Sequence, residues 1–141
     1  MAILFSKLLL ATDGSEHSIR SADCAVELAQ KFHAKVDVVY VIDEKKSKSD
    51  VLQHVDKFDL KIERQEKIKP VLALLDKANI TYEVHFTHGE PAPCIIDFAE
   101  KNESDCVIVG SRGRNKVQTM ILGSVSHKVA KHAACPVLII K

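Results

Sequence analysis

The segment GSRGRNKVQTMILGSVS, residues 110–126, combines residue types that hold a phosphate group. It contains three of the chain's five glycines, Gly110, Gly113 and Gly123. Glycine lets a ligand approach the backbone closely and also permits positive φ. A helix that begins at Gly123 and Ser124 would present unpaired N–H groups at the positive end of its dipole, where a phosphate is stabilised. The segment therefore predicts an anion site, with an ordinary irregular loop as the alternative.

The side chains of this segment also favour an anion. Three cations lie between the glycines and no acidic residue does, while two hydroxyls fall in the first turn of the predicted helix: Arg112, Arg114, Lys116, Ser124 and Ser126. Neither GxxxxGK[ST] nor GxGxxG is present, so the two best-known phosphate motifs do not apply. The segment is a phosphate motif of another kind.

Short β-branched runs alternate with longer amphipathic segments along the chain, which predicts an α/β fold. We expect five strands, at residues 7–12, 35–42, 81–86, 105–110 and 137–140. We expect about four helices: one capped by Ser15 and ending near His33, one over 51–79 broken just before Pro70, one over 91–102, and one capped by Ser124. Right-handed crossovers then give a doubly wound, Rossmann-like parallel sheet of order 3-2-1-4-5. The charged segment 43–50 is predicted to be a mobile loop, or alternatively a lid.

Asp13 and Gly110 follow the two strands that flank the predicted switch point of this sheet. Ligands of open α/β sheets bind at such a point, outside the carboxyl ends of the strands. We therefore expect the turn at Asp13 to face the glycine segment across one crevice. An Asp-Gly pair after a strand is also an ordinary turn, so Asp13 alone is ambiguous.

The composition indicates one globular domain over residues 1–141, with 46% hydrophobic and 28% charged residues. A net charge of +1 produces no overall positive electrostatic potential that would attract nucleic acid, so no nucleic-acid partner is predicted. The apolar N-terminus lacks the basic region of a signal peptide, and no run reaches membrane-span length. We expect a cytoplasmic protein without a membrane partner. Its four cysteines lie far apart without a CxxC pair, which predicts neither a zinc knuckle nor a thioredoxin-like pair, and they are interpreted as reduced thiols.

His85 and His88 form an HxxH pattern that could suggest a metal site. Alternation along a strand places residues three apart on opposite faces, so the pattern does not predict that these two histidines share a metal. Cys106, inside a predicted strand, is interpreted as a small core residue.

The glycine segment resembles the G-x2-G-x9-G-S pattern of the ATP-binding branch of the universal stress protein family. The similarity extends over most of the chain and is weakest over residues 43–80. It is carried by LLLATDGSEHS, VYVID, HGEPAPCIIDFAEKNESDCVIVGSRG and HAACPVLII. Two positions depart from the family's usual residues: Ala11, where many members have proline, and Asn115-Lys116, where Ser-Gly is frequent.

The resemblance implies a set of nucleotide-binding residues. Asp13 resembles the family's aspartate near the ribose and phosphates or their Mg²⁺, with Ala11 and Thr12 bordering the pocket. Val41 resembles the residue whose backbone pairs with the adenine edge. The segment implied to hold ribose and phosphates comprises Val109, Gly110, Arg112, Gly113, Gly123, Ser124, Val125 and Ser126.

The implied function is a regulator of the stress response that binds ATP or another adenine nucleotide such as AMP or cyclic AMP. One alternative is an enzyme, either a slow or autophosphorylating ATPase or one that cleaves ATP between its α and β phosphates. Against it, the residues beside the loop show no evident general base. A dimeric interaction module without nucleotide is the other alternative. The resemblance and the apolar final strand also predict a homodimer through that strand.

Overall fold

A computed structural model describes residues 5–43, 57–111 and 123–141, with side chains from residue 61 onward in the second range. Its centre is a five-stranded sheet of order β3-β2-β1-β4-β5, in which every neighbouring pair is parallel. The strands are β1 (Lys7–Thr12), β2 (Lys35–Ile42), β3 (Tyr82–His88), β4 (Cys106–Gly110) and β5 (Val137–Ile140). The predicted fold class and strand order are confirmed. The third strand is longer than expected, because β3 stays paired with β2 up to Ile42 and His88.

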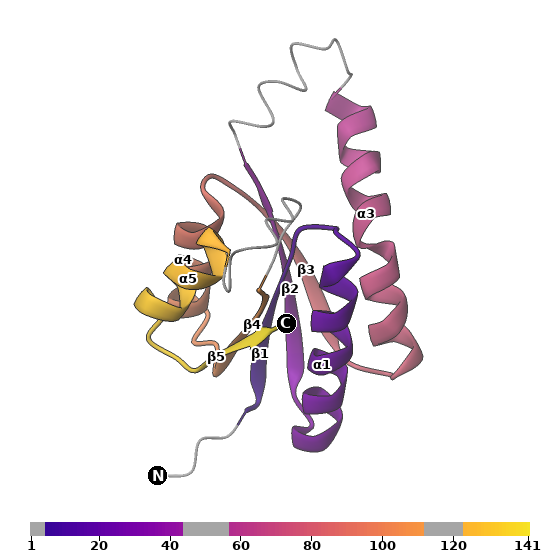
Figure 1. Cartoon of the computed structure of the whole chain (residues 1–141). Coiled ribbons are helices and arrows are strands. Elements are labelled where there is room, and N and C mark those ends of the chain that lie inside the picture. Colours follow the sequence, from indigo (N-terminus) through magenta and orange to yellow (C-terminus); the bar gives the residue numbers. More distant parts are fainter. Residues whose placement is uncertain (1–4, 44–56, 112–122) are drawn as a thin grey trace.

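Two helices cover each face of the sheet (Figure 1). The helices are α1 (His17–Phe32), α3 (Lys57–Lys77), α4 (Pro91–Lys101) and α5 (Ser124–His132). On one face α1 and α3 pack together, and on the other α4 packs against α5. Within the described parts of the chain, no helix has the length and apolar character needed to cross a membrane.

Strand β1 is buried on both faces, which explains its continuous apolar run. Leu8, Leu9 and Leu10 are fully buried. Leu8 and Leu10 belong to the core beneath α1 and α3, whereas Leu9 belongs to the core beneath α4 and α5. This alternation is the period of two of a β-strand. Cys106 is buried in the first of these cores, as predicted.

Helix α3 runs through Pro70 without a break, so the predicted break is wrong. Pro70 itself is exposed, while Val71 and Leu75 are buried in the core that α1 shares. Buried side chains on both sides of the proline, Ile68 before it and Val71 and Leu75 after it, hold the helix together although one backbone hydrogen bond is lost.

Two predicted helix caps are also wrong. The N-cap of α1 is Glu16, and the carbonyl oxygen of Ser15 accepts hydrogen bonds from the N–H and hydroxyl of Ser18. The N-cap of α5 is Gly123, with Ser124 as the first helical residue. Neither helix has a side-chain cap hydrogen bond. The end of α1 is as expected, because His33 is its C-cap in the left-handed conformation.

Candidate functional site

The switch point of the sheet lies between β1 and β4. These strands are neighbours, with Leu10 aligned to Ile108, although the chain continues from β1 to β2 on the other side. Two residues beyond this aligned pair lie Thr12 and Gly110, the last residues of the two strands. The segments that follow Thr12 and Gly110 therefore leave the same edge of the sheet side by side, as the sequence predicts.

The turn after β1 is fixed by its own side chains. Asp13 is half-buried, and its Oδ1 accepts a hydrogen bond from the N–H of Ser15 at 2.9 Å. The hydroxyl oxygen of Thr12 accepts one from the N–H of Gly14 at 3.3 Å. Gly14 has φ +76°, and an added Cβ would lie 2.9 Å from the Cβ of Lys67 on α3. Both the backbone conformation and the packing of α3 thus require glycine here.

The two ends of the glycine segment meet at a backbone hydrogen bond. Gly123 N–H donates to the carbonyl oxygen of Ser111 at 2.7 Å, and Ser111 N–H donates to that of Ile140 at 2.7 Å. Ser111, at the start of the loop, is thereby attached to β5. Gly123, at the end of the loop and the N-cap of α5, is attached to Ser111. An added Cβ on Gly123 would lie 3.1 Å from the Ser111 oxygen. A side chain at Gly123 would therefore require the Ser111 backbone to shift by a few tenths of an ångström.

The start of α5 supplies backbone donors beside this closure. The first hydrogen bond of the helix runs from the N–H of His127 to the carbonyl oxygen of Gly123 at 3.0 Å. The amides of Ser124, Val125 and Ser126 precede that bond, so they lie at the positive end of the helix dipole. The buried hydroxyl of Ser126 donates to the Gly123 carbonyl at 3.0 Å, whereas Ser124 is exposed. An anion at this end would therefore be held by backbone N–H groups and the Ser124 hydroxyl.

Three apolar side chains, called the apolar wall below, lie on the α4 and α5 side of the sheet. Ala11, Val41 and Val125 are partly buried, and all three pack against the core beneath those helices. The side chain of Val109 is buried in that core, so only its backbone is available to a ligand. A flat apolar group could lie against this wall while a charged group reaches the start of α5.

The structure brings most of the predicted residues to one edge of the sheet, while Arg112 and Gly113 lie outside the described residues. It also adds His17, which the sequence did not single out. The His17 Nε2 lies 3.0 Å from the carbonyl oxygen of Ile140. A carbonyl only accepts, so His17 donates this bond and attaches the start of α1 to the end of β5. Only its closeness to the Asp13 turn in the sequence could have suggested it.

The sheet, its switch point and the glycine closure define a doubly wound α/β protein with a candidate anion site at the carboxyl end of the sheet. The sequence model of the universal stress protein family matches residues 4–141. The chain belongs to the universal stress protein family.

Two relatives cover nearly the whole chain. The universal stress protein MJ0531 of Methanocaldococcus jannaschii is 32% identical over 145 residues, which are 98% of this chain and 83% of that protein. The universal stress protein YxiE of Bacillus subtilis is 34% identical over 148 residues, 98% of this chain and 100% of that protein.

Solved structures share the fold. Protein MJ0577 superposes with a TM-score of 0.86 at 27% identity, covering 99% of this chain and 97% of its own. A universal stress protein in complex with cAMP has a TM-score of 0.70 at 23% identity and covers 98% of both chains. One from Archaeoglobus fulgidus in complex with dAMP has a TM-score of 0.72 at 24% identity, covering 99% of this chain and 100% of its own.

Proposed function

We propose that this chain binds ATP or a related adenine nucleotide in the crevice between β1 and β4, and acts as a nucleotide-responsive regulator in the stress response. The observation that supports the proposal is the closure of Gly123 on Ser111, because it brings the first amides of α5 to the carboxyl end of β4, the strand next to the one that Asp13 follows. Helix N-termini bind phosphate through such amides together with the helix dipole.

The three parts of the crevice match the three parts of an adenine nucleotide. The wall of Ala11, Val41 and Val125 offers an apolar surface for the base. The amides at the start of α5 and the Ser124 hydroxyl are placed for phosphate. Ribose then lies between them, near Gly110. The complexes with cAMP and dAMP belong to proteins at or below 24% identity, which share the fold, so the proposal rests on the residues of this chain.

Asp13 fits a role at a magnesium ion that accompanies the phosphates. Its carboxylate is half-buried at the mouth of the crevice and has one oxygen, Oδ1, bonded to the turn. Mg²⁺ prefers oxygen ligands and is commonly held by one or two carboxylates together with substrate phosphates. Bound there, the ion would neutralise phosphate charge. We further propose that the chain is one cytoplasmic domain that dimerises through β5.

The proposal is tested by mass spectrometry of small molecules released from freshly purified, heat-denatured protein. We expect an adenine nucleotide, and its phosphate count distinguishes ATP from AMP. Protein stripped of nucleotide should gain thermal stability with ATP and Mg²⁺ in a concentration-dependent way, because the ligand binds only the folded state. If no nucleotide is released and neither ATP, AMP nor cyclic AMP stabilises the stripped protein, the proposal is wrong.

A further inference from the structure

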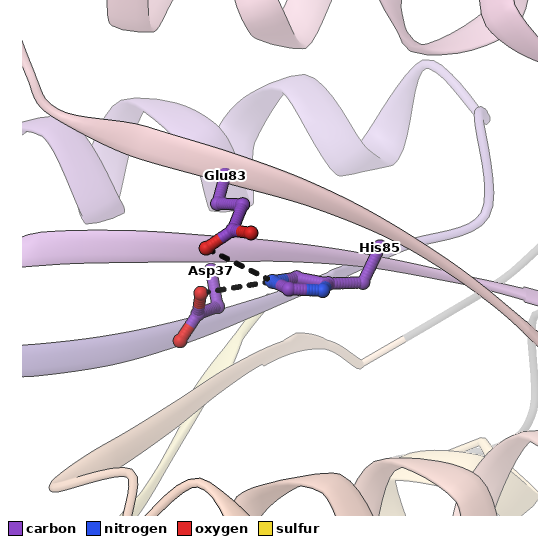
Figure 2. Close-up of side chains that lie close together, drawn as sticks. All are labelled: Asp37, Glu83 and His85. Atoms are coloured by element: carbon purple, nitrogen blue, oxygen red, sulfur yellow. Dashed lines mark hydrogen bonds and ion pairs between the residues drawn. The ribbon is translucent and has the colours of Figure 1, made fainter.

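Three potential metal ligands converge on the α4-side face of the sheet, outside the nucleotide crevice. They are Asp37 on β2 and Glu83 and His85 on β3, and Figure 2 shows their side chains directed toward one another. Asp37 and Glu83 are direct partners in the strand register. His85 lies two residues after Glu83 and so shares its face. Among the described residues, this is the one group of His, Cys, Asp or Glu side chains whose donor atoms approach in this way.

The donor atoms are close enough to share one ion. The Nε2 of His85 lies 3.0 Å from Oδ1 of Asp37 and 4.0 Å from Oε2 of Glu83. All three atoms lie within 4.8 Å of one another. With metal–ligand bonds of about 2.0–2.2 Å, two ligands of one zinc ion can be at most about 4.4 Å apart. Only a small movement of Glu83 is needed, and its side chain is 60% exposed.

Two of the three ligands are held in place by the fold. Asp37 is only 7% exposed, and its neighbours in the strand, Val36 and Val38, are fully buried. The ring of His85 packs against Phe98 of α4, with ring centroids 4.7 Å apart. A buried carboxylate is costly unless it has a partner. Its partner in this structure is His85. The hydrogen bond between them fixes the positions of Oδ1 of Asp37 and Nε2 of His85.

We propose that Asp37, Glu83 and His85 form a binding site for a divalent transition metal, with Zn²⁺ as the ion that suits them best. One imidazole nitrogen with two carboxylate oxygens is a ligand set that zinc accepts, and three protein ligands leave a position for water. The exposure of Glu83 and His85 leaves the site open to solvent. On binding, the proton that Nε2 of His85 directs toward Asp37 is transferred to solvent while Nδ1 carries the remaining proton of the neutral ring, and the Nε2 lone pair then faces the ion.

The competing explanation is a set of ion pairs that only stabilises the fold. Lys35 supports it, because its Nζ lies 3.4 Å from Oε2 of Glu83. The two explanations predict different effects of removing this lysine. If Glu83 is a metal ligand, Lys35→Met frees it and tightens zinc binding. If the group is only structural, Lys35→Met leaves zinc binding unchanged.

Calorimetric titration of Zn²⁺ into chelator-treated, reduced, nucleotide-free protein tests the site. We expect saturable binding of one ion at this site, weakened at least about tenfold by Glu83→Gln or His85→Gln, as loss of a metal ligand requires. The matched control is His132→Gln, which removes an exposed histidine at the end of α5 and should leave the affinity unchanged. Glu83 is exposed, so Glu83→Gln tests the site even if His85→Gln fails to fold.

Backbone amide NMR spectra recorded during a Co²⁺ titration locate the ion. Binding at this site should first broaden the amide signals around Asp37, Glu83 and His85, which separates it from binding at the cysteines or at Asp13. Selective broadening at these residues, together with the loss of affinity in Glu83→Gln, supports the proposal. Wild-type zinc affinity in Glu83→Gln, or first broadening elsewhere, overturns it.

Discussion

Gly123 donates its backbone N–H to the carbonyl oxygen of Ser111 at 2.7 Å, and this bond joins the two ends of the glycine segment. The φ of Gly123 is −70°, a value open to any residue. A side chain here is disfavoured for another reason, because an added Cβ would lie 3.1 Å from the Ser111 oxygen, which is closer than most Cβ contacts. The same bond sets the position of the first amides of α5, so the fold and the proposed phosphate site depend on it together.

Gly123→Ala should therefore lower both stability and nucleotide affinity. Overpacking of this kind costs about 1–3 kcal/mol, and any shift of Ser111 moves the start of α5. Urea unfolding and thermal shift with ATP and Mg²⁺ measure the two effects. The control is Ser124→Ala at the next, exposed position, which should keep wild-type stability and weaken nucleotide binding by about 1 kcal/mol. Wild-type behaviour of Gly123→Ala in both assays would show that neither stability nor nucleotide binding requires glycine at this position.

Asp13 has two separable roles, which a pair of substitutions can divide. Asn retains an oxygen that accepts the Ser15 N–H bond and removes the charge, whereas Ala removes both. We expect Asp13→Asn to keep wild-type stability and Asp13→Ala to lose about 0.5–1.5 kcal/mol. Both should reduce the additional stabilisation that Mg²⁺ gives to ATP, with a smaller effect on AMP. If Asp13→Asn retains the full magnesium effect, the carboxylate serves the turn and not a metal.

The outer edge of β5 should form a homodimer interface. The carbonyl oxygens of Pro136 and Ile140 accept bonds from Val107 and Ser111 on the β4 side, so the backbone groups of Val137 and Ile139 point away from β4. Ile139→Pro removes an outward donor and leaves the bonds to β4 in place, so it should convert a dimer into a folded monomer.

Sedimentation of the wild type, Ile139→Pro and Ile139→Val at micromolar concentration measures this change, and Ile139→Val should stay dimeric. A wild type that sediments as a monomer contradicts the interface and leaves the nucleotide site untouched.

Burial raises the pKa of the Cys106 thiol from 9.0 to about 11. The unfolded chain then loses this proton at lower pH than the folded chain, so the contribution to stability is complete below pH 9.0 and is lost as pH rises to about 11. Urea unfolding of the wild type should show a loss of up to about 3 kcal/mol from this group over that range.

Cys106→Ala is the comparison for this pH effect, because other groups that titrate there are present in both proteins. The variant starts less stable, since it leaves a small cavity, but its stability should fall less steeply with pH. Parallel curves for the two proteins would mean that Cys106 ionises equally easily in the folded and unfolded states.

The sheet order, and the edge of the sheet at which the candidate site residues lie, could be predicted from the sequence alone. The strands at 7–12, 35–42 and 137–140 have the predicted bounds, because each is a short run of β-branched and aliphatic residues, as is typical of a parallel sheet covered by helices. Asp13 and Gly110 were placed together correctly, since the carboxyl ends of neighbouring parallel strands share one edge. Local patterns carry this information because each run must match the period of its own element.

Tertiary structure decided the features that depend on contacts between distant segments. Pro70 is accommodated because Val71 and Leu75 after it pack in the core shared with α1 and Ile68 before it packs with residues of β2, which no local propensity shows. The bond between Ser111 and Gly123, and the donation of His17 to Ile140, join residues whose separation in space is set by the whole sheet. Asp37 meets His85 only because the register of β2 with β3 aligns two segments separated by 48 positions. A spacing pattern describes residues of a single segment, so HxxH could pair His85 only with His88. The pairing of β2 with β3 instead brings Asp37 next to His85.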